Sequence, residues 1–155
     1  MSNDIEKRIT ELGIELPPAA KPAANYVPFI ISGNYVFIAG QLPMHEGKVS
    51  IVGKLGIDVS VEDGQAAARL CALNILAQAK AAADGDLNRV KSCIKLGGFV
   101  NSSADFKDHA LIMNGASDLI SEVLSERGYH ARFAVGAASL PFDAAVEVDG
   151  MFELY

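Results

Sequence analysis

Residues 129–154 read YHARFAVGAASLPFDAAVEVDGMFEL, and this stretch decides the fold. Two apolar, strand-like runs flank the turn-forming sequence Leu140–Asp143. We expect the two runs to pair as a final hairpin over residues 131–154. The first run contains one cation, Arg132, and the second contains the carboxylate Glu147 among valines and alanines.

A cation in a strand that is buried is costly unless it is paired with an acid or binds an anion. Arg132 therefore makes a structural salt bridge or meets a negatively charged ligand, and both alternatives stay open at this point. The pairing register of the hairpin cannot be read from the sequence. We therefore cannot say whether Arg132 and Glu147 share a face of the sheet.

The composition is typical of one globular domain. The chain has 155 residues, half of them hydrophobic, and we see no linker or repeat, so residues 1–155 are expected to form a single domain. The formal net charge is −6 and no window holds a cluster of Lys and Arg, which disfavours nucleic-acid binding. Cys71 and Cys93 lack a CxxC spacing and are interpreted as buried small side chains.

No metal site, cofactor motif or membrane span is expected. No group of His, Cys or carboxylates has a convincing spacing for a metal ligand set. The N-terminal residues are charged and lack the apolar core of a signal peptide, and no apolar run reaches the length of a membrane span. We therefore expect a cytoplasmic protein.

The remaining pattern predicts an α+β fold. Strands are expected at 27–32 and 35–39 around a Gly33-Asn34 turn, at 90–100, and with less regularity near 49–52. Helices are expected at 3–12, where Ser2 or Asn3 is the cap, at 60–83 and at 108–127. Two long helices can cover only one face of the mixed sheet, so its other apolar face is expected to pack on other subunits.

Three blocks of sequence carry a resemblance to a known family. They are GNYVFIAGQLP at 33–43, DFK at 105–107 with the helix after it, and ARFAV…LP…VEV at 131–148. Together they resemble the Rid/YjgF family of reactive-intermediate deaminases, and residues 1–22 resemble the N-terminal extension of its longer branch, often labelled endoribonucleases. The resemblance implies a chorismate-mutase-like fold, a homotrimer with sites between subunits, and no cofactor.

The resemblance also implies a reaction. Family members hydrolyse reactive enamines and imines such as 2-aminoacrylate to 2-keto acids and ammonia. By resemblance Arg132 grips the substrate carboxylate, Glu147 orients or deprotonates the attacking water, and four more residues line the cleft. These are Tyr26, Gly40, Asn114 and, through its backbone carbonyl, Ala134. Ala39 departs from the family by replacing a common serine, and the neighbours of Tyr26 differ from the usual GPYSQ.

Two other functions remain as alternatives to the deaminase. Ala39 and the altered surroundings of Tyr26 motivate a binder of small carboxylates, or a regulatory protein, without turnover. An endoribonuclease or inhibitor of translation comes third, since no nucleophile or acid–base pair for phosphodiester cleavage is visible in the sequence and the net charge is negative.

Overall fold

A computed structural model describes residues 4–22 and 24–155. Its main sheet has five strands in the order β1-β2-β7-β5-β6, and a separate two-stranded sheet is formed by β3 and β4. The strands are β1 Phe29–Ser32, β2 Tyr35–Gln41, β3 Met44–His45, β4 Lys48–Val49, β5 Val90–Asn101, β6 Ala131–Ala137 and β7 Val146–Leu154. The helices are α1 Ile5–Glu11, α2 Val61–Ala82 and α3 His109–Leu124, with short 3-10 turns at Leu87–Arg89, Ser125–Gly128 and Pro141–Asp143.

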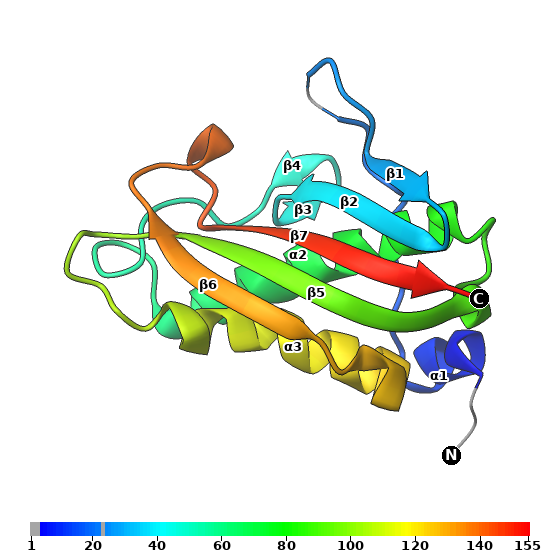
Figure 1. Ribbon diagram of the computed structural model, residues 1–155. Helices are drawn as coiled ribbons and strands as arrows, with labels where there is room; N and C mark the ends of the chain where they lie inside the picture. Colours follow the sequence, from blue (N-terminus) through cyan, green and yellow to red (C-terminus); the bar gives the residue numbers. More distant parts are fainter. Residues whose placement is uncertain (1–3, 23) are drawn as a thin grey trace.

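Helices α2 and α3 cover one face of the main sheet, and the opposite face has no cover from this chain (Figure 1). The two helices approach closely because Gly115 has no side chain: a Cβ there would lie 2.1 Å from the backbone oxygen of Gln65. Strand β7 alternates accordingly, with Val146, Val148 and Phe152 fully buried under the helices. The α+β architecture with two helices on one face is thus confirmed.

The predicted final hairpin is wrong, because β5 lies between β6 and β7. Strand β6 pairs in parallel with β5, with Leu96 opposite Arg132, and β7 pairs antiparallel with β5, with Phe99 opposite Glu147. The predicted tight turn at Leu140–Asp143 is present, with the Asp143 N–H donating to the Leu140 carbonyl at 3.1 Å, but it lies in a connection that returns on the other side of β5. An apolar run in a sequence does not identify its partner strand, which is why the pattern suggested the nearer one.

The first hairpin is confirmed, with Ser32 opposite Tyr35 across Gly33 (φ 61°) and Asn34. Ser60 caps α2 by accepting a hydrogen bond from the backbone N–H of Asp63, as its sequence predicts. The expected strand near 49–52 is only partly present, because β4 ends at Val49.

Two of the predicted helices are shorter than expected: α1 begins later and α3 ends earlier. The proposed caps Ser2 and Asn3 lie outside the described residues, and α1 is capped instead by Asp4. Helix α1 is anchored by Glu6, whose carboxylate lies 2.9 Å from Lys80 Nζ and accepts the N–H of Leu87 at 2.8 Å. Helix α3 was expected to reach Arg127 but ends at Leu124, because Ser125 adopts a positive φ of 53° that breaks the helix.

No helix in the described part of the chain is both long and apolar enough to span a bilayer.

Candidate functional site

Arg132 is held in a cradle of neutral acceptors between β6 and α3. Its guanidinium donates to Asn114 Oδ1 at 3.0 Å, to Ser117 Oγ at 3.1 Å and to the backbone oxygen of Ala110 at 3.3 Å. All three acceptors lie on α3, which packs beside β6 on the helix-covered face. Arg132 and Asn114, both predicted site residues, are therefore direct neighbours.

Behind this cradle, a hydrogen-bonded chain fixes Ser117. The Ser117 hydroxyl lies 2.8 Å from Nε2 of His130, whose Nδ1 lies 2.6 Å from the carbonyl oxygen of Gly128. A carbonyl only accepts, so Nδ1 carries the proton and, in the neutral ring, Nε2 accepts from Ser117. The Ser117 oxygen is then free to accept from Arg132. Ser117 and the role of His130 were not found from the sequence, because residues so far apart in the chain give no periodic signal.

The salt-bridge alternative for Arg132 is not seen within residues 4–22 and 24–155. No carboxylate of that part of the chain lies within salt-bridge distance of the guanidinium. Arg132 is thus a positioned, half-buried cation whose partners are all uncharged. Such a group is suited to bind a carboxylate through two parallel hydrogen bonds.

Glu147 lies on the opposite, uncovered face of the sheet. Its carboxylate packs on the backbone of Gly40 in β2, so closely that a Cβ at Gly40 would lie 2.6 Å from Glu147 Oε2. Partial burial, and next the negative charge of Asp149, raise the pKa of the Glu147 carboxyl above its usual 4.5. Burial also raises the pKa of Asp149, although the Gly97 N–H and Lys95 oppose the shift. Glu147 therefore accepts a proton more readily than an exposed glutamate does.

A small cavity of about 180 Å³ adjoins Gly40 and includes Tyr26. Tyr26 is about half exposed, at 49%, and the other wall includes Phe142. Phe142 was not predicted as a site residue; its place in the connection before β7, with φ 57°, turns its ring to this cavity. Tyr26, Gly40 and Glu147 thus form one group of neighbouring residues.

The six predicted site residues therefore fall into two groups. Arg132 and Asn114 lie together on the helix-covered side, and Ala134 follows on the same face of β6 because strand residues two apart share a face. Glu147 lies on the uncovered face against Gly40, which lines a cavity together with Tyr26. Within one chain, the expected carboxylate clamp and the expected water-orienting acid do not meet.

No set of three or more His, Cys, Asp or Glu side chains in the described residues is arranged to hold a metal ion. Cys71 and Cys93 are both free and buried, and burial raises the pKa of the Cys93 thiol to about 12. Neither cysteine is therefore a ready nucleophile.

The helix-backed mixed sheet with this pair of polar groups defines a protein of the YjgF class, and the sequence comparisons agree. A family model described as "YjgF/chorismate_mutase-like, putative endoribonuclease" matches residues 6–154. The chain belongs to this YjgF/chorismate-mutase-like family, as its sequence blocks predicted.

Three individual proteins show how similar its relatives are. Protein TCP17 of Trypanosoma cruzi is 50% identical over 99% of this chain and 96% of its own length. The structure of Atu1372 from Agrobacterium tumefaciens, a protein of unknown function, has a TM-score of 0.91 at 55% identity, covering 97% of this chain and 92% of that one. Escherichia coli TdcF, solved with bound serine, has a TM-score of 0.65 at 25% identity over 88% of this chain and 94% of its own.

Proposed function

We propose that this protein is a hydrolytic deaminase that converts reactive 2-enamines and 2-imino acids, such as 2-aminoacrylate, to 2-keto acids and ammonia. The observation that carries the proposal is the Arg132 cradle. Arg132 is held by Asn114, Ser117 and the Ala110 carbonyl, and it has no acidic partner among the described residues. Its guanidinium can therefore bind the carboxylate that every 2-imino acid carries. The serine bound by TdcF, itself a small carboxylate, agrees with a ligand of this size.

In the proposed reaction, an enamine first becomes the imine by gaining a proton on its CH2 carbon and losing one from nitrogen, both exchanged with water. Water then adds to the carbon of the C=N bond while Glu147 takes up a proton from that water and the imine nitrogen gains one from solvent. The carbinolamine that forms carries one hydroxyl and one amine on the same carbon. Its C–N bond then breaks as the nitrogen gains the proton held by Glu147 and the hydroxyl loses its proton to water, so that ammonia leaves and the 2-keto acid remains. The raised pKa of Glu147 favours uptake of this proton, compared with an exposed glutamate. No cofactor is required for any step.

We propose further that each complete site is shared by two subunits of a homotrimer. Arg132 and Asn114 would come from one subunit, and Tyr26, Gly40 and Glu147 from its neighbour. The uncovered sheet face supports this assembly, because it exposes large apolar side chains that a second copy would bury. These include Ile30 at 56%, Tyr35 at 44%, Phe37 at 43% and Val135 at 44% exposure.

A coupled assay tests the activity. A pyridoxal-phosphate lyase generates 2-aminoacrylate, and its decay is followed with the wild type, with Arg132→Ala, and with Arg69→Ala. Arg69 is a matched control, since it is a surface arginine on α2 that pairs with Glu122 at 3.6 Å. The proposal expects faster decay with the wild type and Arg69→Ala but not with Arg132→Ala. Unchanged decay in the presence of wild-type protein would refute this substrate class.

A binder of small carboxylates without turnover is the second candidate. It is favoured by Ala39, which offers no hydroxyl beside Gly40 where related proteins commonly have serine. Saturable binding of a 2-keto acid such as pyruvate, lost in Arg132→Ala and accompanied by no imine hydrolysis, would select this function.

The endoribonuclease named in the family description is the third candidate. An acidic chain of net charge −6 repels the phosphate backbone of RNA. An RNA-cleaving activity that stays with the protein through further purification would support this function. If it also survives substitution of both Arg132 and Glu147, the cleavage occurs at a site other than the proposed deaminase site.

A further inference from the structure

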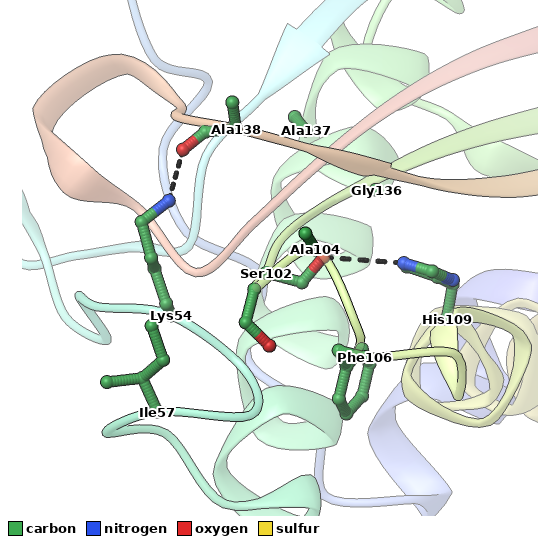
Figure 2. A pocket seen from close by; sticks show the side chains of 10 residues that line it. Lys54, Ile57, Ser102, Ala104, Phe106, His109, Gly136, Ala137 and Ala138 are labelled. Atoms are coloured by element: carbon green, nitrogen blue, oxygen red, sulfur yellow. Dashed lines mark hydrogen bonds between the residues drawn. The ribbon is translucent and has the colours of Figure 1, made fainter.

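A second cavity, of about 580 Å³, lies at the carboxyl ends of β5 and β6, beside the start of α3 (Figure 2). None of the six predicted site residues lines it. Gly136, its contribution from β6, is four residues beyond Arg132, or about 13 Å along a strand. Its walls are formed by Lys54, Ile57, Ser102, Ser103, Ala104, Phe106, His109, Gly136, Ala137 and Ala138. None of these ten residues is acidic, although the chain as a whole has a net charge of −6.

Lys54 supplies a positioned cation to this cavity. Its ammonium donates to Asn101 Oδ1 at 2.8 Å and to the backbone oxygen of Ala138, the contact drawn in Figure 2. Both acceptors are uncharged, and no salt bridge to Lys54 exists among the residues the structure describes. The nearby carboxylate of Asp58 accepts a hydrogen bond from the backbone N–H of Lys54 at 2.6 Å, so it stabilises the loop between the two residues and does not pair with the ammonium. An ammonium has three N–H groups, which leaves one for a ligand.

Ser102 and His109 form a polar wall of the cavity. Ser102 is 8% exposed, and its Oγ lies 3.4 Å from Nε2 of His109, which Figure 2 shows pointing toward it. Gly136 makes this arrangement possible, because a Cβ there would lie 2.7 Å from that nitrogen and 2.9 Å from that oxygen. The ring of His109 is also fixed by an edge-on contact with Phe106, with centroids 5.4 Å apart.

Ser103 adds an unused hydroxyl. Its Oγ is buried and has no hydrogen-bond partner among the residues that the structure describes. A buried polar group without a partner is costly, and rotation of this hydroxyl toward a ligand in the cavity would satisfy it. Helix α3 begins at His109 in the same wall, with Asp108 as its cap residue.

From these features we infer that the cavity is a binding site for a small organic oxyanion, separate from the proposed deaminase site. The anionic head, a carboxylate or a phosphate ester, would lie between Lys54, His109 and the serine hydroxyls. The apolar part of the ligand would contact Ile57, which is 69% exposed, and Phe106. The inference does not depend on the deaminase activity, because the two sites share no residue.

Calorimetric titration with benzoate, phenyl phosphate and the neutral control benzyl alcohol tests the inference at fixed ionic strength. The wild type should bind at least one anion saturably and the alcohol not at all. Lys54→Met should weaken that binding at least about tenfold, because it removes a charged hydrogen bond. Gly136→Ala should weaken it similarly by displacing Ser102 and His109. Saturable binding should persist in Arg132→Ala, in which the proposed carboxylate clamp is removed and only this cavity is left to bind the anion. The preferred probe identifies the anionic head.

Two results would overturn the inference. One is the absence of saturable binding by either anion to the wild type. The other is binding that is lost in Arg132→Ala alone, or that survives both Lys54→Met and Gly136→Ala when each is combined with Arg132→Ala. The contacts of Lys54 with Asn101 and Ala138 would then be structural only. Thermal melts show whether Lys54→Met remains folded, and if it does not, Gly136→Ala decides the question. Ligand-induced shifts of the His109 imidazole in NMR spectra locate the anion directly.

Discussion

Arg132 and Glu147 lie on opposite faces of one sheet, with β5 running between their strands. Arg132 sits opposite Leu96 and turns its side chain to α3, while Glu147 sits opposite Phe99 and lies against Gly40 on the uncovered face. A single chain therefore presents a carboxylate-binding cation on one side and a proton acceptor on the other. This separation gives the proposed site its most specific consequences.

The first prediction concerns subunit sharing. If the protein forms the proposed trimer, the Arg132→Ala and Glu147→Gln variants should each be inactive alone. Subunits of the two variants, unfolded and refolded together in equal amounts, should recover about a quarter of the wild-type activity per site. Each complete site then needs an intact arginine from one subunit and an intact glutamate from its neighbour, each present with even odds. No recovery in verified mixed trimers would mean that both residues act within one chain.

Asn114→Asp should weaken substrate binding. The new carboxylate would lie near 3.0 Å from the Arg132 guanidinium and compete with the substrate carboxylate. We expect KM to rise at least about tenfold while thermal stability is kept, because the charged pair replaces a neutral hydrogen bond. Ser117→Ala, which removes one acceptor and adds no charge, is the control and should have a smaller effect. An unchanged KM in Asn114→Asp would argue against Arg132 as the clamp.

Gly40→Ala should displace Glu147. The added Cβ meets Glu147 Oε2 at 2.6 Å, so the carboxylate must move and imine hydrolysis should fall. Because the crowded atom is the end of a flexible, half-buried side chain, we expect the cost in unfolding free energy to lie at the lower end of overpacking, about 1 kcal/mol. In a Glu147→Ala background the same glycine substitution should cost much less, which a double-mutant cycle from urea unfolding measures. Equal costs in both backgrounds would place the strain elsewhere.

The burial of Glu147 should make stability depend on pH. A carboxyl whose pKa is raised by folding binds its proton more tightly in the native state, so its ionisation above the raised pKa destabilises the fold. Glu147→Gln should therefore increase the unfolding free energy at about pH 8, and the difference should vanish as the pH falls below the usual 4.5. Because the side chain is only half buried, we expect no more than about 1 kcal/mol.

Unfolding curves at both pH values check this expectation. Glu46→Gln is the control, since the Glu46 side chain is 86% exposed. A stabilisation by Glu147→Gln that grew toward low pH would have the opposite sign and would contradict the burial argument.

Helix α1 should contribute to stability. Ile9 is 7% exposed and belongs to the core, so Ile9→Ala should lower the unfolding free energy by about 2–4 kcal/mol. Thr10→Ala, on the exposed side of the same helix, should cost far less. Urea unfolding compares the two, and equal costs would mean that α1 is not docked in solution.

Much of the local structure follows from the sequence alone. Ser60 caps α2 and Gly33-Asn34 closes the first hairpin, because capping and turn chemistry depend on residues that are neighbours in the chain. The sequence also predicted that one sheet face is covered by helices and the other is not, because two long amphipathic helices can cover only one face. Arg132 and Glu147 stood out as candidates because charged residues are rare in apolar strands.

Only the tertiary structure decided the strand order and the contacts around each candidate residue. It inserted β5 between β6 and β7, set Arg132 and Glu147 on opposite faces, joined Ser117 and His130 behind the guanidinium, and brought Lys54 to the start of α3. These relations join residues far apart in the chain. They are selected by how the whole core packs, and no local periodicity or propensity records that choice.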